Sequence, residues 1–387
     1  MDVIKELISR SRREAGMFAL LLVLCIWTAL QTIPEAGGLL DSTFLSLRNI
    51  NNVINRIGIY GIFSIGIGLV IISAGIELSV GSMMALLGIV FFFFLGEWHT
   101  TIVDTIGVWH WSLSVLAILC IGTVMGLIHG LLIAKARMQA FIVTLCGLLA
   151  YRGIARTVSE DTTKGYVLGE VESLYDWCAG SVLDVMVRMS AWFQGVPKGD
   201  LMPGRDDRGV FENLLANIPM PFVYLVIIAT ITYVVLHRSV YGRYLFALGR
   251  NEMATKYSGI NTTAVMCSAY VICGFFTAIA SILYAFYTDS VMASTHATFF
   301  ELYGIAAAVL GGCSLRGGEG SIIGIVIGTA ILIVLRNMVN LMGYESSLSD
   351  AITGLVIFVG VLMDDVGFKG LVGIGNRILK RNPSPGD

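Results

Sequence analysis

Charged side chains are scarce in this chain. Only 13% of its 387 residues are Asp, Glu, Lys or Arg, whereas 56% are hydrophobic, and the mean hydropathy is +0.80. Soluble domains carry about 25% charged residues, so the composition excludes a soluble protein of this length and indicates a polytopic helical membrane protein. Outside residues 237–262 there is no basic patch with interleaved aromatic residues, which argues against a nucleic-acid partner.

Catalytic and metal-binding patterns are missing as well. The seven cysteines have neither metal nor redox spacing, and six of them fall in apolar runs, where cysteine behaves as a small hydrophobic residue. No Ser/His/Asp, Cys/His or two-carboxylate set shares one face at one depth, which argues against a membrane-embedded hydrolase. The sequence also lacks a Gly-x-x-x-x-Gly-Lys-Ser/Thr loop for ATP. We therefore predict that the chain is not an enzyme and binds no metal or cofactor itself.

Apolar runs dominate what is present. A run must cross about 30 Å of hydrocarbon at 1.5 Å per residue, and ten runs suit this, near residues 17–33, 54–74, 78–96, 112–134, 139–157, 219–236, 264–286, 302–315, 321–342 and 349–364. The expected fold class is all-α, a polytopic transmembrane helical bundle of about ten spans. The basic first 16 residues place the N-terminus in the cytoplasm, and ten spans then place both ends there. This topology puts 15 of the 25 Lys and Arg residues on the cytoplasmic side.

The chain accordingly divides into five parts. We expect a cytoplasmic N-terminal segment (1–16), spans one to five (17–157), an extracytoplasmic insert (158–217), spans six to ten (218–364) with a cytoplasmic loop (237–262), and a cytoplasmic tail (365–387). The insert has ten acidic residues against five basic ones. Within it, apolar residues recur every three or four positions from Leu174 to Trp192, as in an amphipathic helix. That helix either covers the bilayer surface or the outer ends of the spans, or contacts a partner.

Two joints between spans are unusually short. Residues 57–95 contain one charged residue, Glu77, and must turn near residues 73–82, while residues 310–321 contain five glycines. Non-helical backbone at membrane depth is tolerated only where protein or a water-filled cavity satisfies it, and interrupted spans are typical of a transport path. The candidate path residues in these joints are Glu77, Ser79, Gly81, Ser82, Gly311, Gly312 and Ser314.

Residues 241–260 form a polar stretch between two apolar runs. Asn251 is placed to cap a helix that starts at Glu252, Ser258 and Gly259 are placed to end it, and Gly242 and Gly249 are expected to punctuate the helices. Apolar residues recur at helical spacing: Leu245, Leu248, Met253 and Tyr257. The stretch is either an ordinary basic cytoplasmic loop or a short helix on the membrane face that a cytoplasmic partner pushes.

Five ionisable residues lie in or beside the spans. Glu77 either lines the path or caps the following helix through the amides of residues 78 and 79. His129 is expected to pack against a neighbouring helix rather than relay protons. Arg336, beside two asparagines, is a polar tie between helices or part of an outer gate, and Arg152 is expected to extend to the outer membrane interface together with Arg156.

Four ordered motifs resemble those of the ribose-type permease subunits of bacterial ATP-binding cassette importers. They are Gly75-Ile-Glu-Leu-Ser-Val-Gly-Ser82, Arg137-Met-Gln-Ala-Phe-Ile-Val-Thr-Leu145, the stretch from Gly242 to Ile260, and the stretch from Glu301 to Ser321. The resemblance covers residues 50–157 and 219–364. It departs at Glu77, where the family usually has Asp, at Cys313, where it usually has Thr, and at the acidic insert, which is longer than the family's.

The resemblance implies a subunit of a sugar importer in the bacterial inner membrane. Two permease chains, most simply a homodimer in membrane lipid, would enclose the path for a ribose-like monosaccharide, with cytoplasmic ATPase subunits that hold ATP and Mg²⁺ and an extracytoplasmic sugar-binding protein as partners. Transport would proceed by alternating access. The residues that would couple the chain to the ATPase are Gly242, Arg243, Gly249, Asn251, Glu252, Ala254, Ser258 and Gly259. The alternative is an ion-coupled carrier of small polar solutes that uses Glu77 or His129.

Overall fold

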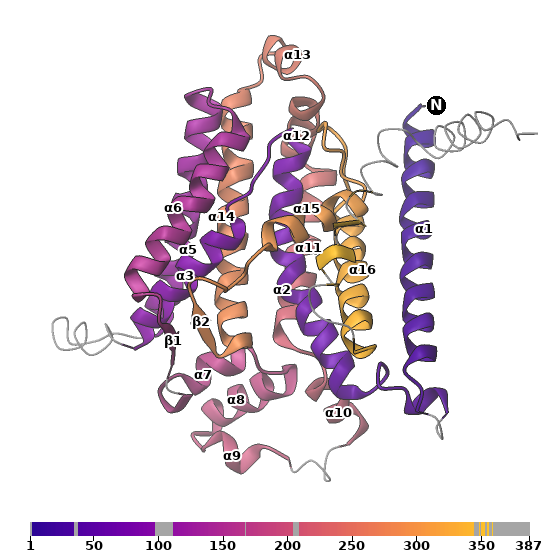
Figure 1. Cartoon of the computed structure of the whole chain (residues 1–387), viewed down its shortest axis with the longest axis vertical. Coiled ribbons are helices and arrows are strands. Elements are labelled where there is room, and N and C mark those ends of the chain that lie inside the picture. Colours follow the sequence, from indigo (N-terminus) through magenta and orange to yellow (C-terminus); the bar gives the residue numbers. More distant parts are fainter. Residues whose placement is uncertain are drawn as a thin grey trace, which may run out of the picture.

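The computed structural model is a bundle of helices with almost no sheet (Figure 1). It describes residues 2–34, 38–96, 111–166, 168–203 and 209–343, together with seven positions between 348 and 358. Within these ranges, seven helices contain a stretch long and apolar enough to cross a membrane: α1 (Asp2–Gln31), α2 (Leu47–Ile72), α5 (Trp111–Gly130) with the π-helical turn η2 (Leu131–Lys135), α6 (Ala140–Ser159), α11 (Met220–Arg238), α14 (Thr262–Thr288) and α16 (Ile322–Leu341). The fold class predicted from the sequence is confirmed.

Two further apolar helices are too short to cross a membrane alone. They are α3 (Val80–Leu95) and α15 (Phe300–Leu310), and each adjoins one of the predicted broken joints. Nine of the ten predicted spans therefore correspond to helices, while most of the tenth (349–364) lies outside the described residues. α2 begins seven residues before the predicted span because Ser46 caps it, its side chain accepting a hydrogen bond from the Asn49 amide. The cap, rather than the apolar run, determines where the helix starts.

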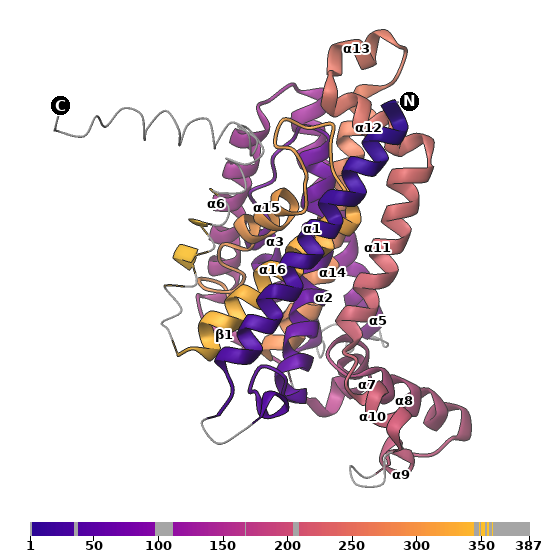
Figure 2. The same ribbon diagram turned by 90° about the vertical axis from the view of Figure 1, so that its right-hand side faces the viewer.

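Helix α2 forms the centre of the bundle. It packs against α11, α14, α15 and α16, and every residue from Gly58 to Ile72 is buried. A helix that is apolar on all sides is stable only when neighbours cover all of it, and α2 has such neighbours. Helix α1 is the opposite case, since it packs mainly along α16 and stands at the edge of the bundle (Figures 1 and 2).

Helices α5 and α14 approach each other at backbone distance along a stripe of glycines. A Cβ on Gly126 would lie 2.3 Å from the Tyr270 carbonyl oxygen, and one on Gly274 would lie 2.3 Å from the Gly122 carbonyl oxygen. Gly130 meets the backbone of Cys267 in the same way. Small residues every four positions permit this close packing between apolar helices.

The insert forms a separate lobe of short helices at one end of the bundle, here called the insert lobe. It comprises α7 (Leu168–Cys178), α8 (Val182–Gln194), α9 (Lys198–Leu201) and α10 (Val210–Ala216) (Figure 1). The sequence predicted one amphipathic helix where α7 and α8 lie. The helix breaks because Ser181 caps α8 together with Asp184, so the chain turns at residues 179–181. A two-stranded antiparallel sheet, β1 (Thr163–Gly165) with β2 (Ser290–Met292), links the start of this segment to the bundle.

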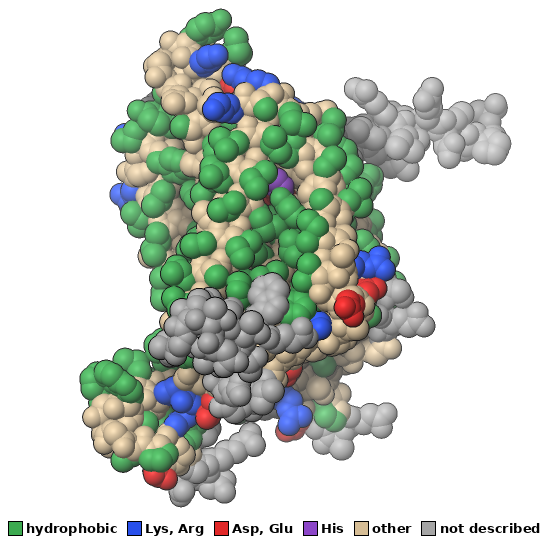
Figure 3. Space-filling view, turned by 90° about the vertical axis from the view of Figure 1, so that its left-hand side faces the viewer, with side chains coloured by type: hydrophobic (Ala, Val, Ile, Leu, Met, Phe, Trp, Pro, Cys, Tyr) green, Lys and Arg blue, Asp and Glu red, His purple; other side chains and the backbone are tan. Residues whose placement is uncertain are grey.

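The opposite end of the bundle carries α12 (Val240–Arg250), which packs against the ends of the long helices, and α13 (Glu252–Tyr257), which projects beyond them (Figure 1). In the space-filling view, hydrophobic side chains cover the middle of the molecule, and Lys, Arg, Asp and Glu gather mainly towards its two ends (Figure 3). This distribution is typical of a protein whose middle section contacts lipid.

Candidate coupling site and transport path

Helices α12 and α13 form one segment, here called the α12–α13 projection, in which α12 packs on the bundle and α13 is exposed; local sequence signals start and stop each helix. Ser239 caps α12, and the side chain of Asn251 caps α13 by accepting a hydrogen bond of 2.9 Å from the Ala254 amide. The projection ends at Ser258 and Gly259, whose φ of +81° suits glycine. The predicted cap and stop are therefore confirmed.

The outer face of α13 exposes large apolar side chains. Met253 is 56% exposed and Tyr257 is 83% exposed, whereas Leu245 and Leu248 of α12 are buried against the bundle. Arg243, Ala254 and Ser258 are also exposed. The apolar residues that recur at helical spacing therefore have two roles. Leu245 and Leu248 hold α12 against the bundle, whereas Met253 and Tyr257 form an accessible surface on α13. Such a surface is suited to contact another protein.

The predicted role of Gly242 and Gly249 as helix punctuators is wrong, because both lie inside α12. They are instead points of close contact. A Cβ on Gly242 would lie 1.8 Å from the Leu236 carbonyl oxygen, and one on Gly249 would lie 1.9 Å from the Ile72 carbonyl oxygen and 2.4 Å from the Gly318 amide nitrogen. Real Cβ atoms essentially never approach other atoms within 3.0 Å, so these positions require glycine.

Gly249 marks a junction of three segments distant in sequence. The amide of Gly318 donates a hydrogen bond of 2.9 Å to the carbonyl of Ile72, at the end of α2. Gly317, with φ of +85°, lies against Ala74 in the other joint. The two broken joints therefore contact each other, and α12 packs directly onto their contact. The sequence singled out all three segments but gave no sign that they meet.

Glu77 lies in the extended segment between α2 and α3 and is buried, with 2% of its surface exposed. One carboxylate oxygen accepts hydrogen bonds from the Ser79 amide (2.8 Å) and hydroxyl (2.6 Å). The other lies 2.8 Å from His129 Nδ1, and His129 Nε2 lies 3.0 Å from the hydroxyl of Tyr151 on α6. Glu77 thus caps the start of α3 through Ser79. Through His129 and Tyr151 it also links the segment between α2 and α3 to α5 and α6. His129 is packed and bonded to neighbouring segments, as predicted.

The remaining candidate path residues fall at the two joints. Gly81 lies against the Glu301 carboxylate and the Ala297 carbonyl, where its Cβ would come within 2.4 Å of each oxygen. Gly311 meets the backbone of Gly324 in α16. Ser79 and Ser82 are buried, Gly312 has a φ of +88°, and Ser314 is half-buried. In this conformation the chain's own helices surround these residues, and their contact with a solute stays a prediction.

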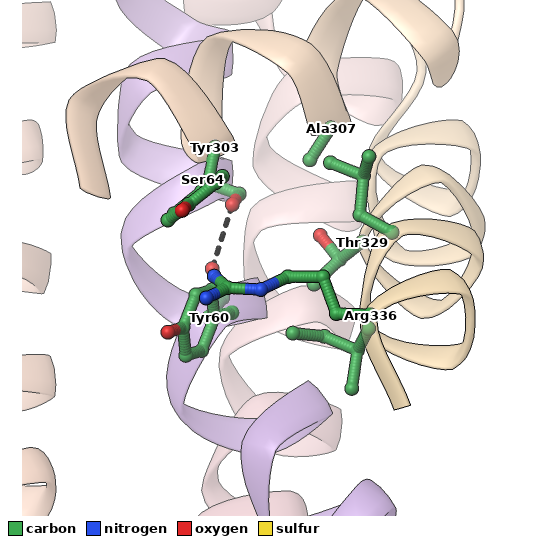
Figure 4. A pocket seen from close by; sticks show the side chains of 8 residues that line it. Tyr60, Ser64, Tyr303, Ala307, Thr329 and Arg336 are labelled. Carbon is green, nitrogen blue, oxygen red and sulfur yellow. Dashed lines mark hydrogen bonds between the residues drawn. The ribbon is translucent and has the colours of Figure 1, made fainter. Parts of the chain in front are cut away.

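A small cavity lies between α2, α15 and α16, and the sequence does not predict it (Figure 4). Its volume is about 10 Å³, which is enough for about one water molecule. The Arg336 guanidinium lies 4.2 Å from the centre of the Tyr303 ring, and its buried Nη1 has no hydrogen-bond partner among the described residues. The lining includes the side chains of Tyr60, Ser64, Tyr303, Ala307, Thr329 and Arg336.

Other polar side chains of the bundle bond neighbouring segments together. Next to Arg336, Asn337 exchanges hydrogen bonds of 2.7 and 3.1 Å with Asn49 of α2. The guanidinium of Arg152 donates to the carbonyls of Ala293 and His296, in the segment after β2, and its extension to the outer interface stays a prediction. Among the described residues, no group of three or more His, Cys, Asp or Glu is placed to hold a metal ion.

In the described part of the chain, nine apolar helices, two of them short helices beside broken joints, and a helix (α12) that contacts both joints are typical of the membrane-spanning subunit of a transport system. Over residues 49–361 the chain matches the family of permease components described as "Branched-chain amino acid transport system / permease component", and it belongs to that family. It is a multi-pass membrane permease of the ribose type and a transport component without its own ATPase site.

Curated relatives agree with this assignment. The chain is similar to the ribose import permease protein RbsC of Escherichia coli strain K12, at 32% identity over 84% of this chain and 88% of that protein. It is 31% identical to RbsC of Bacillus subtilis, over 84% of this chain and 87% of that protein. Identity to the xylose transport system permease protein XylH of Escherichia coli strain K12 is 30%, over 84% of this chain and 86% of XylH. No solved structure matches the chain.

Proposed function

We propose that this chain forms the translocation path for a ribose-like monosaccharide in an ATP-binding cassette importer of the bacterial inner membrane. The permeases named for ribose and xylose support the substrate class. In this proposal the ends of the chain and the α12–α13 projection are cytoplasmic, and the insert lobe is extracytoplasmic. The excess of Lys and Arg in the segments so placed supports this orientation.

The observation that carries the proposal is the junction at Gly249. A partner ATPase that binds ATP and Mg²⁺ would move α13 through its exposed Met253 and Tyr257. The backbone of α12 at Gly249 packs directly against the backbone of Ile72 and Gly318. No flexible side chain lies between them that could change rotamer and so reduce the movement that is passed on. A displacement of α12 would therefore reach both interrupted helix pairs at once, which is what alternating access requires of a lever.

A salt bridge joins the projection to a third segment. Arg137, in the turn between η2 and α6, donates a hydrogen bond of 2.7 Å to Glu252 at the start of α13. Both side chains are substantially exposed, so solvent screening keeps the pair's contribution to stability below about 1 kcal/mol. Because the pair is weak, it could break in each transport cycle, so that Glu252 binds a side chain of the partner in place of Arg137.

The path itself is proposed between two permease chains, next to the joints and the cavity of Figure 4. Tyrosine rings, hydroxyl groups and the unpaired Arg336 nitrogen suit a neutral polyol, which offers hydroxyl groups for hydrogen bonds and apolar ring faces for aromatic stacking. The bundle has few other charged groups within its spans, which argues against an ion-coupled carrier. A soluble sugar-binding protein would deliver the substrate.

The proposal is tested by purifying the chain with its partners in mild detergent and measuring ATPase activity with and without the co-purified sugar-binding protein. Recovery of a nucleotide-binding subunit is expected, with sugar-dependent ATPase activity that falls in the variant Met253→Ser/Tyr257→Ser. The matched control is Tyr244→Ser, which removes a partly exposed apolar side chain from α12. Recovery of a lone homo-oligomer that moves sugar with a proton gradient would refute the importer and favour the carrier.

A further inference from the structure

Helix α8 of the insert lobe presents an apolar face that the chain leaves uncovered. Met186, Met189, Trp192 and Phe193 form this α8 patch and are 48%, 47%, 77% and 75% exposed. They share one side of the helix. Leu183, Val187 and Ala191 on the other side are buried, and so is Val185 in the first turn of the patch side. The rings of Trp192 and Phe193 pack against each other with centroids 4.9 Å apart. An aromatic surface of this kind is costly in water, so it indicates a non-aqueous contact.

The backbone fixes α8 at the level where α11 begins. The Val182 amide donates to the Ile218 carbonyl, and the amide of Met220, the first residue of α11, donates to the Gly180 carbonyl, each at 3.0 Å. The Tyr224 hydroxyl also donates to the Trp177 carbonyl. At 1.5 Å per residue, α11 is about as long as the hydrocarbon layer is thick, so its first residue lies near the membrane boundary. The start of α8 lies there too.

The lobe extends sideways from that point. It projects past α11, on the side of the bundle away from α15 and the joint that follows it (Figure 2). Hydrophobic side chains continue over its outer part (Figure 3). Along α11, which begins beside the lobe, large apolar residues are about half exposed: Val226, Ile227, Ile231 and Val234. The lobe and α11 therefore both present apolar side chains outwards.

The polar groups of the lobe pair among themselves. Arg188 contacts Asp176 and Glu172, and Lys198 contacts Asp176 at 2.7 Å and Asp184 at 3.2 Å. These contacts tie α7, α8 and α9 together and engage both described bases of the lobe. The patch is thus rigid and apolar, and Trp and Phe beside a membrane boundary are typical of interfacial helices.

We propose that α8 lies in the interfacial layer of the membrane, with the α8 patch among the lipid chains beside α11. The insert lobe then anchors this end of the permease laterally to lipid and leaves the area above α15 and α16 free. This inference depends on α11 spanning the membrane and not on the identity of the transported solute.

The test uses the full-length chain in nanodiscs of phosphatidylcholine whose acyl chains are either plain or brominated, because bromine quenches nearby tryptophan. The contribution of Trp192 is the difference in fluorescence between the wild type and Trp192→Phe. We expect brominated lipid to reduce this difference at least twofold. The control is Trp192→Phe/Gly199→Trp, which places the tryptophan on α9, where a Cβ meets no atom within 4 Å. Its added fluorescence should fall by much less.

Two outcomes would overturn the inference. In one, brominated lipid leaves the Trp192 contribution unchanged and aqueous iodide quenches it, which shows that the patch faces water. In the other, lipid has no effect but added sugar-binding protein shields Trp192 from iodide, which assigns the patch to a protein partner. Trp192→Phe preserves an aromatic ring at an exposed site, so failure of the lobe to fold does not confuse the comparison.

Discussion

Replacing Gly249 by alanine tests whether the backbone junction transmits movement. The added Cβ would lie 1.9 Å from the Ile72 carbonyl oxygen. Restoring a separation of 3.0 Å requires the backbones to part by about 1.1 Å, which also strains the hydrogen bond from the Gly318 amide to the same oxygen. Overpacking costs about 1–3 kcal/mol and a lost hydrogen bond about 0.5–1.5 kcal/mol. We expect the free energy of unfolding to fall by about 2–4 kcal/mol.

The functional effect should be larger than the loss of stability. Sugar uptake by reconstituted vesicles should drop at least tenfold in Gly249→Ala, at a temperature where the variant is still folded, while the partner ATPase continues to hydrolyse ATP. The control is Gly153→Ala in α6, where a Cβ meets nothing within 4 Å and alanine should be neutral or stabilising by up to about 1 kcal/mol. Wild-type uptake and wild-type unfolding by Gly249→Ala would refute the reasoning.

Three further variants test separate contacts. Glu77→Gln removes the charge that faces His129, and chemical denaturation should show a loss of about 1.5–3 kcal/mol; the double variant with His129→Gln should lose little more, and additive losses would contradict a shared interaction. Arg137→Ala should change stability by less than about 1 kcal/mol, whereas Glu252→Ala should also reduce ATPase coupling; equal effects on coupling would show that the salt bridge itself is what matters. Burial alone would raise the pKa of Asp184, but hydrogen bonds from the Ser181 amide and hydroxyl and the charge of Lys198 outweigh it and lower that pKa below 3.8. Its contribution to stability is therefore full above about pH 4 and is lost as the pH falls through the lowered pKa, so denaturation curves of wild type and Asp184→Asn should converge in acid and not at neutral pH.

Features set by local sequence could be predicted. Hydropathy identifies spans because the thickness of the hydrocarbon layer fixes their length, and nine runs correspond to helices. The cap at Asn251 could also be predicted, because it depends on residues three positions apart. Hydropathy does not predict where a helix begins or ends, since polar residues and a serine cap extend α2 beyond its apolar run.

Contacts between distant segments could not be predicted from one sequence. Glycine often ends helices, so the sequence alone predicts helix punctuation at Gly249, yet its role depends on Ile72 and Gly318, which are remote in the chain. The cavity beside Arg336 likewise combines residues of three helices, and no local spacing distinguishes Tyr60 or Tyr303 from ordinary span residues. Glu77 shows an intermediate case: its bond to Ser79 is local and was foreseen, while its pairing with His129 crosses helices.

The glycine stripe between α5 and α14 limits how this molecule can change shape. Two helices whose backbones touch at Gly122, Gly126 and Gly274 cannot slide past each other by a fraction of a turn without a steric clash. They therefore move as one rigid unit, and a conformational change of the bundle must occur between other helices. Gly312, Gly317 and Gly318, with φ values from +75° to +88°, instead form the turn of the second joint, so the sequence divides its glycines between helix packing and backbone turns.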